Sequence, residues 1–447
     1  MKFFFEDSKD GNENCYIDNQ KEKNDREYIT GGKEERKEVM KESFKMVTRK
    51  HENGSGCDLK LFSQESAHKI REFHKSFPVY APTPLAHLEE TAKCLGLKDV
   101  YVKDESWRFG LNAFKVLGGS YAIGNYLAGR LGKDISEVNY ETLISDETRK
   151  ELGDITFVTA TDGNHGRGVA WTANQFKQKS VVYMPKGSAL ERLNNIKAEG
   201  AQASITDLNY DEAVRLANSQ AEQKGWVMVQ DTAWEGYEDI PTWIMQGYGT
   251  MVMEADQQLK EAGIDRPTHV FVQAGVGSLA GAVVGYFAHK YKENPPVMVV
   301  CEASAADCLY RSAVKESGEL VNVTGDLETI MAGLACGEGN TIGWDILRNH
   351  VSVFASCPDW MSAKATRIYA NPIGNDPHIV SGESGSVPLG LCYTALHDED
   401  AKDLKEALKL DENSNILVIS TEGDTDPVRY REIVWDGLYG TNESLSK

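Results

Sequence analysis

The sequence lacks the features that membrane-spanning and nucleic-acid-binding proteins need. No run approaches the roughly 18 to 20 apolar residues of a membrane span, and the opening MKFFFEDSKD is too short in apolar residues for a signal peptide. Basic residues are in the minority, with 48 Lys+Arg against 68 Asp+Glu and a net charge of -20. Phosphate binding relies on clustered Lys and Arg. We therefore expect a cytoplasmic protein that binds neither membrane nor nucleic acid.

Cysteine motifs and metal-ligand patterns are also missing. The eight Cys include no CxxC, which is typical of the scattered thiols of an intracellular enzyme, although a bridge between Cys308 and Cys336 is one possibility. No cluster of His, Cys and carboxylates has ligand spacing. The sequence therefore indicates no metal site.

Residues 1–55 differ from the rest of the chain. They hold 12 basic and 13 acidic residues, and such a segment buries too little apolar surface to offset its ordering entropy. We predict a mobile extension with a helix over residues 33–47. The remaining residues are enough for a large globular body, since 447 residues correspond to two or three domains at about 150 residues each.

Apolar runs of strand length alternate with longer amphipathic stretches from about residue 60. Several runs are continuous Val, Ile and Phe without polar alternation, which is typical of strands covered by helices on both faces. The pattern predicts doubly wound α/β domains with parallel strands. The expected strands are residues 100–105, 155–160, 180–185, 203–208, 226–231, 269–274, 297–303 and 416–421.

The first candidate for chemistry is Lys115, in the stretch NAFKVLGG. An amine desolvated among apolar neighbours becomes more nucleophilic, as Schiff-base chemistry requires. Most lysines in such a setting instead extend to solvent. The setting of Lys115 is therefore compatible with a Schiff-base lysine and with an ordinary surface lysine.

A second candidate is the loop TDGNHG, which follows the strand at 155–160. Thr161, Gly163 and Asn164 would present N–H groups at a helix N-terminus, where a substrate carboxylate can bind. Asp162 adds a negative charge there, which suggests a separate task such as proton transfer. Asp162 as a simple N-cap or turn residue, and His165 as a helix-start residue, are the alternatives.

A third candidate is the loop after the strand at 269–274, with Gly275, Val276, Gly277, Ser278 and Leu279 placed to bind a phosphate. The same segment satisfies the dinucleotide fingerprint GxGxx(G/A), with Glu302 ending the next strand as a ribose-binding acid. A dinucleotide-dependent oxidoreductase is therefore an alternative. It leaves Lys115 and the TDGNHG loop unexplained.

Pyridoxal phosphate uses all three elements, since it needs a lysine for its aldehyde, a helix N-terminus for its phosphate and a loop for ring and substrate. The segments NAFKVLGG, TDGNHGRGVAW, QDTAWEGYEDIPTWIMQGYGT, QAGVGSLAG and STEGDTD resemble those of the diaminopropionate ammonia-lyases, within the tryptophan-synthase-like (fold type II) pyridoxal phosphate enzymes. The resemblance covers about residues 60–437.

The resemblance implies roles for individual residues. Lys115 would bind the cofactor's aldehyde, residues 275–279 its phosphate, and Asn164 its phenolic oxygen. Either Ser420 or Thr421 would face the pyridine nitrogen. The resemblance also implies a homodimer.

Two acidic residues distinguish the expected substrate from the substrates of the dehydratases. Dehydratases of this fold carry a serine at the position of Asp162, whereas 2,3-diaminopropionate carries a β-ammonium, which needs a nearby carboxylate when buried. Asp162 and Asp231, the latter at the end of WVMVQD, are the candidates, although Asp231 could be a capping residue. The resemblance implies elimination to pyruvate and two ammonia from both the L and the D substrate, with Lys115 and Asp162 as bases for opposite enantiomers. A serine or threonine dehydratase is the runner-up, and a catalytically silent amino-acid sensor is a third class.

The expected organisation is two α/β domains with the cofactor in the cleft between them. A charged extension covers residues 1–55, a large cofactor-binding domain residues 56–105 and 235–447, and a small domain residues 106–234.

Overall fold

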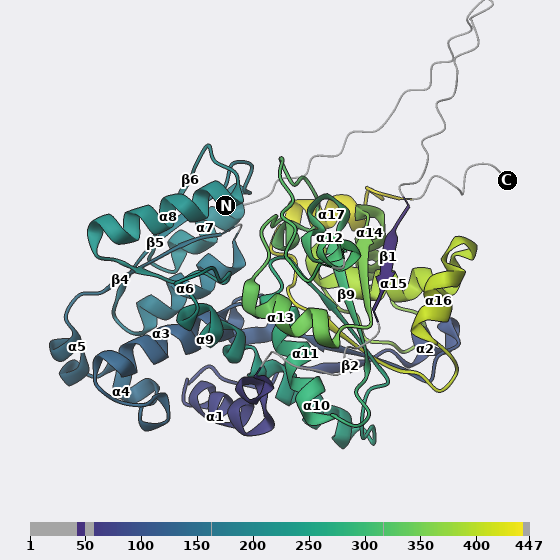
Figure 1. Ribbon diagram of the computed structural model, residues 1–447, viewed down its shortest axis with the longest axis horizontal. Helices are drawn as coiled ribbons and strands as arrows, with labels where there is room; N and C mark the ends of the chain where they lie inside the picture. The colour runs from purple at the N-terminus through teal and green to yellow at the C-terminus, as the bar shows by residue number, and fades with distance from the viewer. Residues whose placement is uncertain (1–42, 50–57, 162, 316, 441–447) are drawn as a thin grey trace, which may run out of the picture. The chain divides into compact units, whose positions relative to one another are not determined.

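Two separate sheets organise the described part of the chain, which the computed structural model gives as residues 43–49, 58–161, 163–315 and 317–440. One sheet has seven strands in the order β1-β10-β9-β8-β11-β3-β2, and the other has four in the order β6-β5-β4-β7 (Figure 1). The strands are β1 Lys45–Thr48, β2 Leu85–His87, β3 Asp99–Asp104, β4 Thr156–Ala160, β5 Lys179–Met184, β6 Gln202–Ile205, β7 Val227–Met228, β8 His269–Gln273, β9 Val297–Ala303, β10 Val353–Cys357 and β11 Asn415–Ser420.

Parallel pairing dominates both sheets. The four-stranded sheet is parallel throughout, and so are the five central strands of the larger sheet. Only the edge strands β1 and β2 run antiparallel to their neighbours. Parallel strands bring their carboxyl ends to one edge of a sheet, where ligands bind in folds of this class.

Helices fill the connections between the strands. They are α1 Gln64–Lys75, α2 Glu89–Leu95, α3 Val116–Arg130, α4 Tyr140–Ile144, α5 Asp146–Leu152, α6 Asn164–Gln175, α7 Leu190–Ala198, α8 Tyr210–Lys224, α9 Asp239–Gly247, α10 Gly249–Glu261, α11 Ser278–Lys290, α12 Cys308–Lys315, α13 Thr341–His350, α14 Asp359–Ala370, α15 Glu383–His397, α16 Lys402–Leu408 and α17 Pro427–Val434, together with the 3-10 helix η2 Glu105–Gly110. None of the helices in the described ranges is both long and apolar enough to cross a bilayer.

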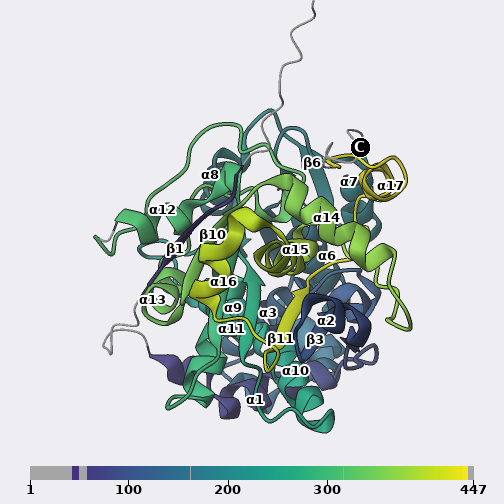
Figure 2. The same cartoon turned by 90° about the vertical axis from the view of Figure 1, so that its right-hand side faces the viewer.

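Both faces of the larger sheet are buried, because successive residues of each strand supply opposite cores. In β8, Val270 and Val272 join one hydrophobic cluster, and Phe271 between them joins the other. α15 covers one face by packing on β8, β9 and β11, with α14 and α16 beside it (Figure 2). On the opposite face α11 packs on β8, and α13, α9 and α10 pack on α11. This double coverage explains the continuous apolar runs of the sequence.

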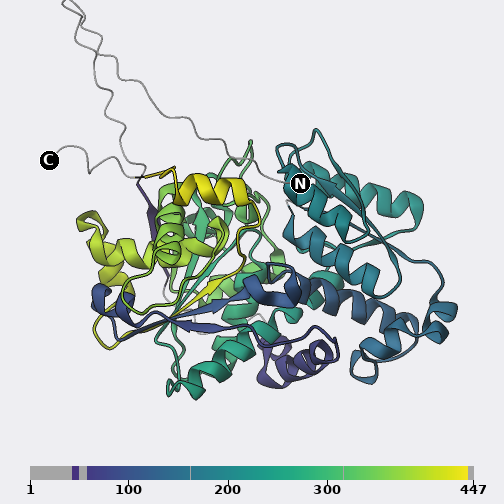
Figure 3. The same ribbon diagram turned by 180° about the vertical axis from the view of Figure 1, so that it is seen from behind.

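The smaller sheet is covered in the same way. α6 packs on β4 and β5, α7 packs on α6 and β6, and α8 packs on β4, β5 and β7. Seen from behind, this sheet and its helices stand beside the larger sheet (Figure 3), and α3 joins the two by packing on both α6 and α9. The doubly wound α/β class expected from the sequence is confirmed.

All eight strands expected from the sequence are present, and β1, β2 and β10 are additional. The helix expected over residues 33–47 is wrong where the structure describes it, since Lys45–Thr48 forms β1 and pairs with β10. The same pairing corrects the expected mobility for residues 45–48, while residues 1–42 and 50–57 lie outside the described ranges. The proposed domain boundaries stay a prediction.

Candidate active site

One cavity gathers the segments that follow β4, β7, β8 and β11. The empty space at this site, including the open solvent at its mouth, is about 640 Å³. The strand ends and helix starts around it come from both sheets. Its lining residues are Phe114, Lys115, Thr161, Asn164, His165, Tyr210, Asp231, Gln273, Gly275, Val276, Gly277, Ser278, Leu279, Gly333, Leu334, Cys336, Ser384, Thr421 and Glu422. Most of the residues expected from the sequence therefore meet in one place.

Lys115 lies at the N-terminus of α3 and is directed into the cavity. Its Nζ donates a hydrogen bond to Asp231 Oδ2, and the two side chains form an ion pair. Lys115 is 20% exposed at its side chain, whereas Asp231 is 4% exposed. The lysine therefore faces the cavity, and the buried carboxylate of Asp231 neutralises its charge.

Asp231 stays ionised despite its burial. Burial by itself raises the pKa of this carboxyl, but the charges of Lys115 and His165 and the hydrogen bond from Lys115 outweigh it and hold the pKa well below its usual range. The other carboxylate oxygen accepts hydrogen bonds from Gln230 Nε2 at 3.3 Å and from Tyr210 at 3.4 Å. A carboxylate held in this state suits charge pairing better than proton removal.

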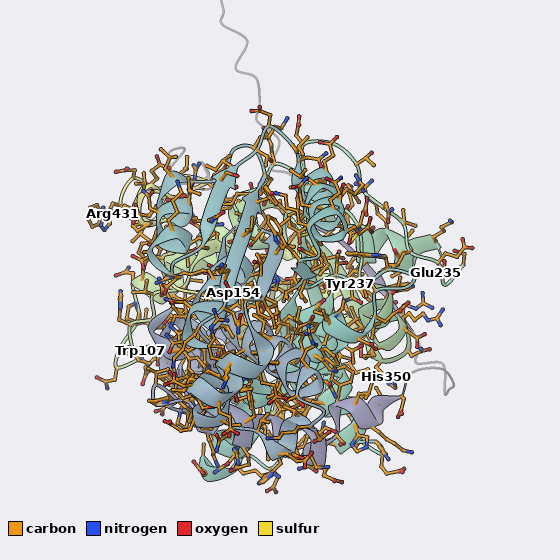
Figure 4. The ribbon with its side chains drawn as sticks, turned by 90° about the vertical axis from the view of Figure 1, so that its left-hand side faces the viewer. Trp107, Asp154, Glu235, Tyr237, His350 and Arg431 are labelled. Carbon is orange, nitrogen blue, oxygen red and sulfur yellow. The ribbon has the colours of Figure 1, made fainter. Side chains whose placement is uncertain are left out.

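The segment that carries Asp231 is fixed by neighbouring side chains. His165, 2% exposed, has its Nε2 2.8 Å from the carbonyl oxygen of Val229. The Tyr237 hydroxyl accepts from Gln230 N at 2.8 Å and donates to the carbonyl oxygen of Met228 at 3.0 Å. Figure 4 shows Tyr237 among the inner side chains and Glu235, from the same loop, pointing outward. His165 therefore does more than start a helix, because it anchors the strand end before Asp231.

The TDGNHG loop joins β4 to α6. Thr161, 1% exposed, accepts through Oγ1 from the N–H groups of Gly163 at 3.0 Å and Gly166 at 3.1 Å. These two N–H groups are thus already used inside the loop, and Gly163 does not line the cavity. Asn164 is in the lining and donates through Nδ2 to Glu422 Oε2. Asp162 lies outside the described residues.

The loop at residues 275–279 leads from β8 into α11, as expected. Gly277 has a φ of 98° and precedes Ser278, and no side chain caps the helix, so the first-turn N–H groups have no intrahelical acceptor. A Cβ at Gly277 would lie 3.2 Å from Leu309, which leaves glycine as the fitting residue. Such a helix start binds anions.

Ser278 ties this loop to the Asp231 segment. Its hydroxyl donates to the carbonyl oxygen of Asp231 and accepts from Asn340 Nδ2, the latter at 2.7 Å. Ser278 and Asn340 are 3% and 0% exposed. Ser278 thereby holds the helix start beside the lysine and its carboxylate partner.

The dinucleotide alternative fails at its acidic residue. Glu302 is fully buried, and its carboxylate accepts from the backbone N–H groups of Leu309 at 2.8 Å and Tyr310 at 2.6 Å. It therefore caps the N-terminal end of α12 and does not line the cavity. Cys308, in the same helix start, is a free buried thiol, so the bridge to Cys336 is not formed.

The two hydroxyls after β11 differ in position. Thr421 lines the cavity and accepts from Gln273 Nε2 at 2.9 Å. The Ser420 hydroxyl is fully buried and donates to Ser381 at 2.9 Å, away from the cavity lining. The geometry therefore separates the two candidates that the sequence left equal.

Sequence reasoning did not single out several lining residues, notably Tyr210, Gln273, Ser384 and Glu422. Glu422 was within reach, because it is the acid in STEGDTD directly after a strand. Tyr210 and Ser384 lie at helix starts, and nothing in their local sequence marks them.

Comparison with known proteins identifies the family. Residues 77–422 match the family model described as pyridoxal-phosphate dependent enzyme. The chain is 53% identical over 401 residues, 90% of this chain and 99% of its relative, to diaminopropionate ammonia-lyase of Salmonella typhimurium. It belongs to the diaminopropionate ammonia-lyase family of pyridoxal phosphate enzymes. The resemblance noted in the sequence motifs is thereby confirmed, and the cofactor is pyridoxal phosphate.

Two further matches place the chain within its family. A crystal structure of the Escherichia coli diaminopropionate ammonia-lyase, in complex with an aminoacrylate-PLP azomethine reaction intermediate, matches with a TM-score of 0.81 and 48% identity, covering 89% of this chain and 98% of that one. An L-threonine dehydratase from Salmonella typhimurium is 29% identical over 55% of this chain and 41% of its own length. The dehydratases are thus the more distant relatives.

The residues of the cavity fit the cofactor. The cavity offers a primary amine at Lys115, an uncapped helix N-terminus at Gly277 for a phosphate, and a hydroxyl at Thr421. The uncapped helix start is the deciding observation, since first-turn N–H groups without acceptors favour an anion.

Proposed function

We propose that the chain catalyses the α,β-elimination of 2,3-diaminopropionate, as the L and the D enantiomer, to pyruvate and two molecules of ammonia. The observation that carries this proposal is the single cavity in which Lys115, Asp231 and the helix start at residues 275–279 meet. The relatives that bear the name diaminopropionate ammonia-lyase support the substrate.

Four groups would hold the cofactor. Lys115 would bind its aldehyde carbon, and the loop of Gly275, Val276, Gly277, Ser278 and Leu279 would bind its phosphate. Asn164 would contact its phenolic oxygen. Thr421 is the better candidate for the pyridine nitrogen, because Ser420 is committed to Ser381. When bound, the cofactor supplies the electron sink that stabilises negative charge at the substrate's α-carbon.

Lys115 would act as the base for one enantiomer. A neutral amine takes up the α-proton and becomes an ammonium, and Asp231, already ionised, stabilises that ammonium at the same Oδ2. Asp231 thus favours proton uptake by Lys115 and keeps the amine near the α-carbon. The carbon–nitrogen bond at the β-carbon then breaks with its electron pair going to nitrogen, and the released aminoacrylate hydrolyses to pyruvate and the second ammonia.

Asp162 would be the base for the other enantiomer. Its position in the loop after β4 places it, by sequence, between Thr161 and Gly163, with Thr161 in the cavity lining. Thr161, Asp162 and Gly163 remain the predicted contacts for the substrate carboxylate region. Asp162 also remains a predicted partner of the β-ammonium, whereas the same role predicted for Asp231 competes with its ion pair to Lys115.

Assembly and location are also part of the proposal. We expect a cytoplasmic homodimer that takes an amino acid as its small-molecule substrate, with a small domain at residues 106–234 that closes on a large domain and excludes water.

A substrate panel tests the proposed function. Purified holoenzyme is assayed for 2-oxo acid release from L- and D-diaminopropionate, serine and threonine. We expect diaminopropionate to react much faster than serine or threonine. A preference for serine or threonine would support the dehydratase alternative and overturn the proposal.

A second test removes the side-chain amine of Lys115. Lys115→Ala should lose at least about 10³-fold in kcat, because it lacks both the attachment amine and one base. Reduction with borohydride should fix the cofactor to the wild-type chain at Lys115 and not to the variant. A variant with normal turnover would contradict the assignment.

A further inference from the structure

Glu422 is a buried acid with an unused oxygen on the wall of the cavity. It directly follows Thr421, lines the cavity and is 2% exposed. Its Oε2 accepts from Asn164 Nδ2 and, at 3.4 Å, from Thr425 Oγ1. Its Oε1 is buried and has no hydrogen-bond partner among the described residues. Buried polar atoms are nearly always hydrogen-bonded, so this oxygen points to a ligand.

The backbone around Glu422 holds the side chain in place. Its main chain pairs with Ala113, two residues before Lys115, and its carbonyl oxygen accepts from Gly382 N at 2.9 Å. A Cβ at Gly382 would lie 2.9 Å from Glu422 Cγ, so the side chain packs directly on that glycine. Glu422 and Lys115 are therefore carried by two neighbouring backbone segments.

Glu422 forms no direct ion pair within the described ranges, and Arg192 reaches it only through Thr425, whose hydroxyl accepts from Arg192 and donates to Glu422 Oε2. The lysine in the cavity is paired with Asp231. The nearby Glu383 has the same sign of charge, and its pKa rises to about 7 through burial and through the charge of Glu422. An isolated buried charge is costly unless a partner of opposite sign reaches it.

We propose that Glu422 binds the β-ammonium group of the substrate and selects diaminopropionate over amino acids with a β-hydroxyl. The proposal rests on the proposed function, because it concerns the substrate of that reaction. Asp231 is committed to Lys115, whereas Glu422 has one oxygen available to a cation in the cavity. A hydroxyl brings no charge to compensate this carboxylate, so serine and threonine gain much less from it.

The test uses full-length holoenzyme with Glu422→Gln, which keeps the volume and an oxygen that Asn164 can donate to. We expect kcat/KM for diaminopropionate to fall roughly 100-fold, as expected for breaking a buried charged contact, and kcat/KM for serine to change less than about threefold. Glu302→Gln is the matched control, since Glu302 is equally buried but lies outside the cavity lining. It should leave the ratio of the two substrates unchanged.

A binding measurement separates substrate recognition from turnover. In a Lys115→Ala background, calorimetry compares diaminopropionate with alanine, which lacks the β-ammonium. Adding Glu422→Gln should weaken the binding of diaminopropionate roughly 100-fold and leave the affinity for alanine unchanged. Equal losses for both ligands would assign Glu422 a structural role and overturn the proposal.

Two outcomes distinguish failure of the role of Glu422 from failure of the proposed function. A wild-type enzyme that releases no pyruvate from diaminopropionate would overturn the proposed function. An active wild type whose substrate ratio is unaffected by Glu422→Gln would overturn only the role of Glu422. If that variant does not fold, Glu422→Asp keeps the charge one methylene further back and should lower kcat/KM for diaminopropionate while leaving serine unchanged; equal losses would again contradict the role.

Discussion

At the scale of single residues, carboxylates of one cavity differ in what surrounds them. Asp231 is paired with Lys115, and its pKa is held low, although burial alone would raise it. Glu422 keeps one oxygen without a partner among the described residues. The same functional group is therefore fitted to two tasks, stabilising a protonated lysine and receiving a cationic substrate.

Asp162 provides the test of two bases. Asp162→Asn removes the charge and the basicity but nearly preserves the size. We expect kcat/KM for D-diaminopropionate to fall roughly 100-fold, because a positioned base contributes about 10² to 10⁴ in rate.

The L form should lose less than about tenfold in the same assay, since Lys115 supplies its base. Parallel measurements on both enantiomers decide the matter. Equal losses would mean that a single base serves both.

Local sequence predicted those site residues that combine a special residue type with a strand end or with the start of a helix. Lys115, Asn164 and the loop at 275–279 are of this kind, and the cavity contains all three. The choice between Ser420 and Thr421 needed the structure, because it depends on Ser381, which lies 39 residues away from Ser420. The unused oxygen of Glu422 likewise follows only from packing between distant segments.

At the scale of elements, α3 and α9 determine where the lysine lies. Lys115 precedes the first turn of α3, and α9 approaches that turn closely at Gly247. A Cβ at Gly247 would lie 2.8 Å from Gly118 Cα and even nearer to the carbonyl oxygen of Leu117. Glycine is therefore needed at this contact for close approach of two backbones.

Gly247→Ala should push the two helices apart. We expect a loss of about 2 kcal/mol in the free energy of unfolding, as is usual for overpacking, together with a lower kcat because Lys115 moves. Denaturant unfolding and the substrate assay measure the two effects.

Gly129→Ala is the matched control, since Gly129 lies in α3 with nothing within 4 Å of its added Cβ. It should raise the free energy of unfolding by about 0.5 to 1 kcal/mol, because alanine favours the helix. Equal destabilisation by both substitutions would argue against the close-contact explanation.

The elements that sequence reasoning missed are short or atypical. β2 has three residues, and β10 contains Ser and Cys within FASC. β1 lies in a strongly charged segment whose composition favours disorder, yet its four residues pair with β10. Pairing at a sheet edge is a tertiary effect, and it overrides the local preference.

At the scale of the whole molecule, a buried cluster of charged side chains holds the segment that leads from β3 to Lys115. Arg108 donates to Glu105 at 2.7 Å and to Glu254 at 2.7 Å, and Lys103 donates to Glu254 at 2.9 Å. All four side chains are at most 2% exposed. The cluster joins β3, η2 and α10, and the chain runs from η2 directly to Lys115.

Glu254→Gln should destabilise the protein by about 3 to 5 kcal/mol near neutral pH, because it leaves buried cations without their partner. Burial raises the pKa of Glu254, but Arg108 and Lys103 outweigh it and lower the pKa from 4.5 to about 2. The stabilisation is therefore fully present above about pH 4.5 and is lost as the pH falls towards 2.

The difference in unfolding free energy between wild type and variant should accordingly shrink over that acidic range. Glu72→Gln is the control, since Glu72 is half exposed in its pair with Lys75; it should cost less than about 1 kcal/mol at neutral pH. A gap between wild type and Glu254→Gln that is constant from pH 5 to pH 2 would contradict the assignment.

The strand order also has a consequence for biosynthesis. The four strands of the smaller sheet lie within residues 156–228 and are synthesised one after another, whereas β11, the last strand of the chain, inserts between β8 and β3 in the middle of the larger sheet. A growing chain can therefore complete the smaller sheet early, while the larger one has an open seam until residues 415–420 emerge. Thr421 and Glu422 follow immediately, so the active site is among the last parts of the molecule to assemble, and a prematurely terminated chain exposes two unpaired strand edges.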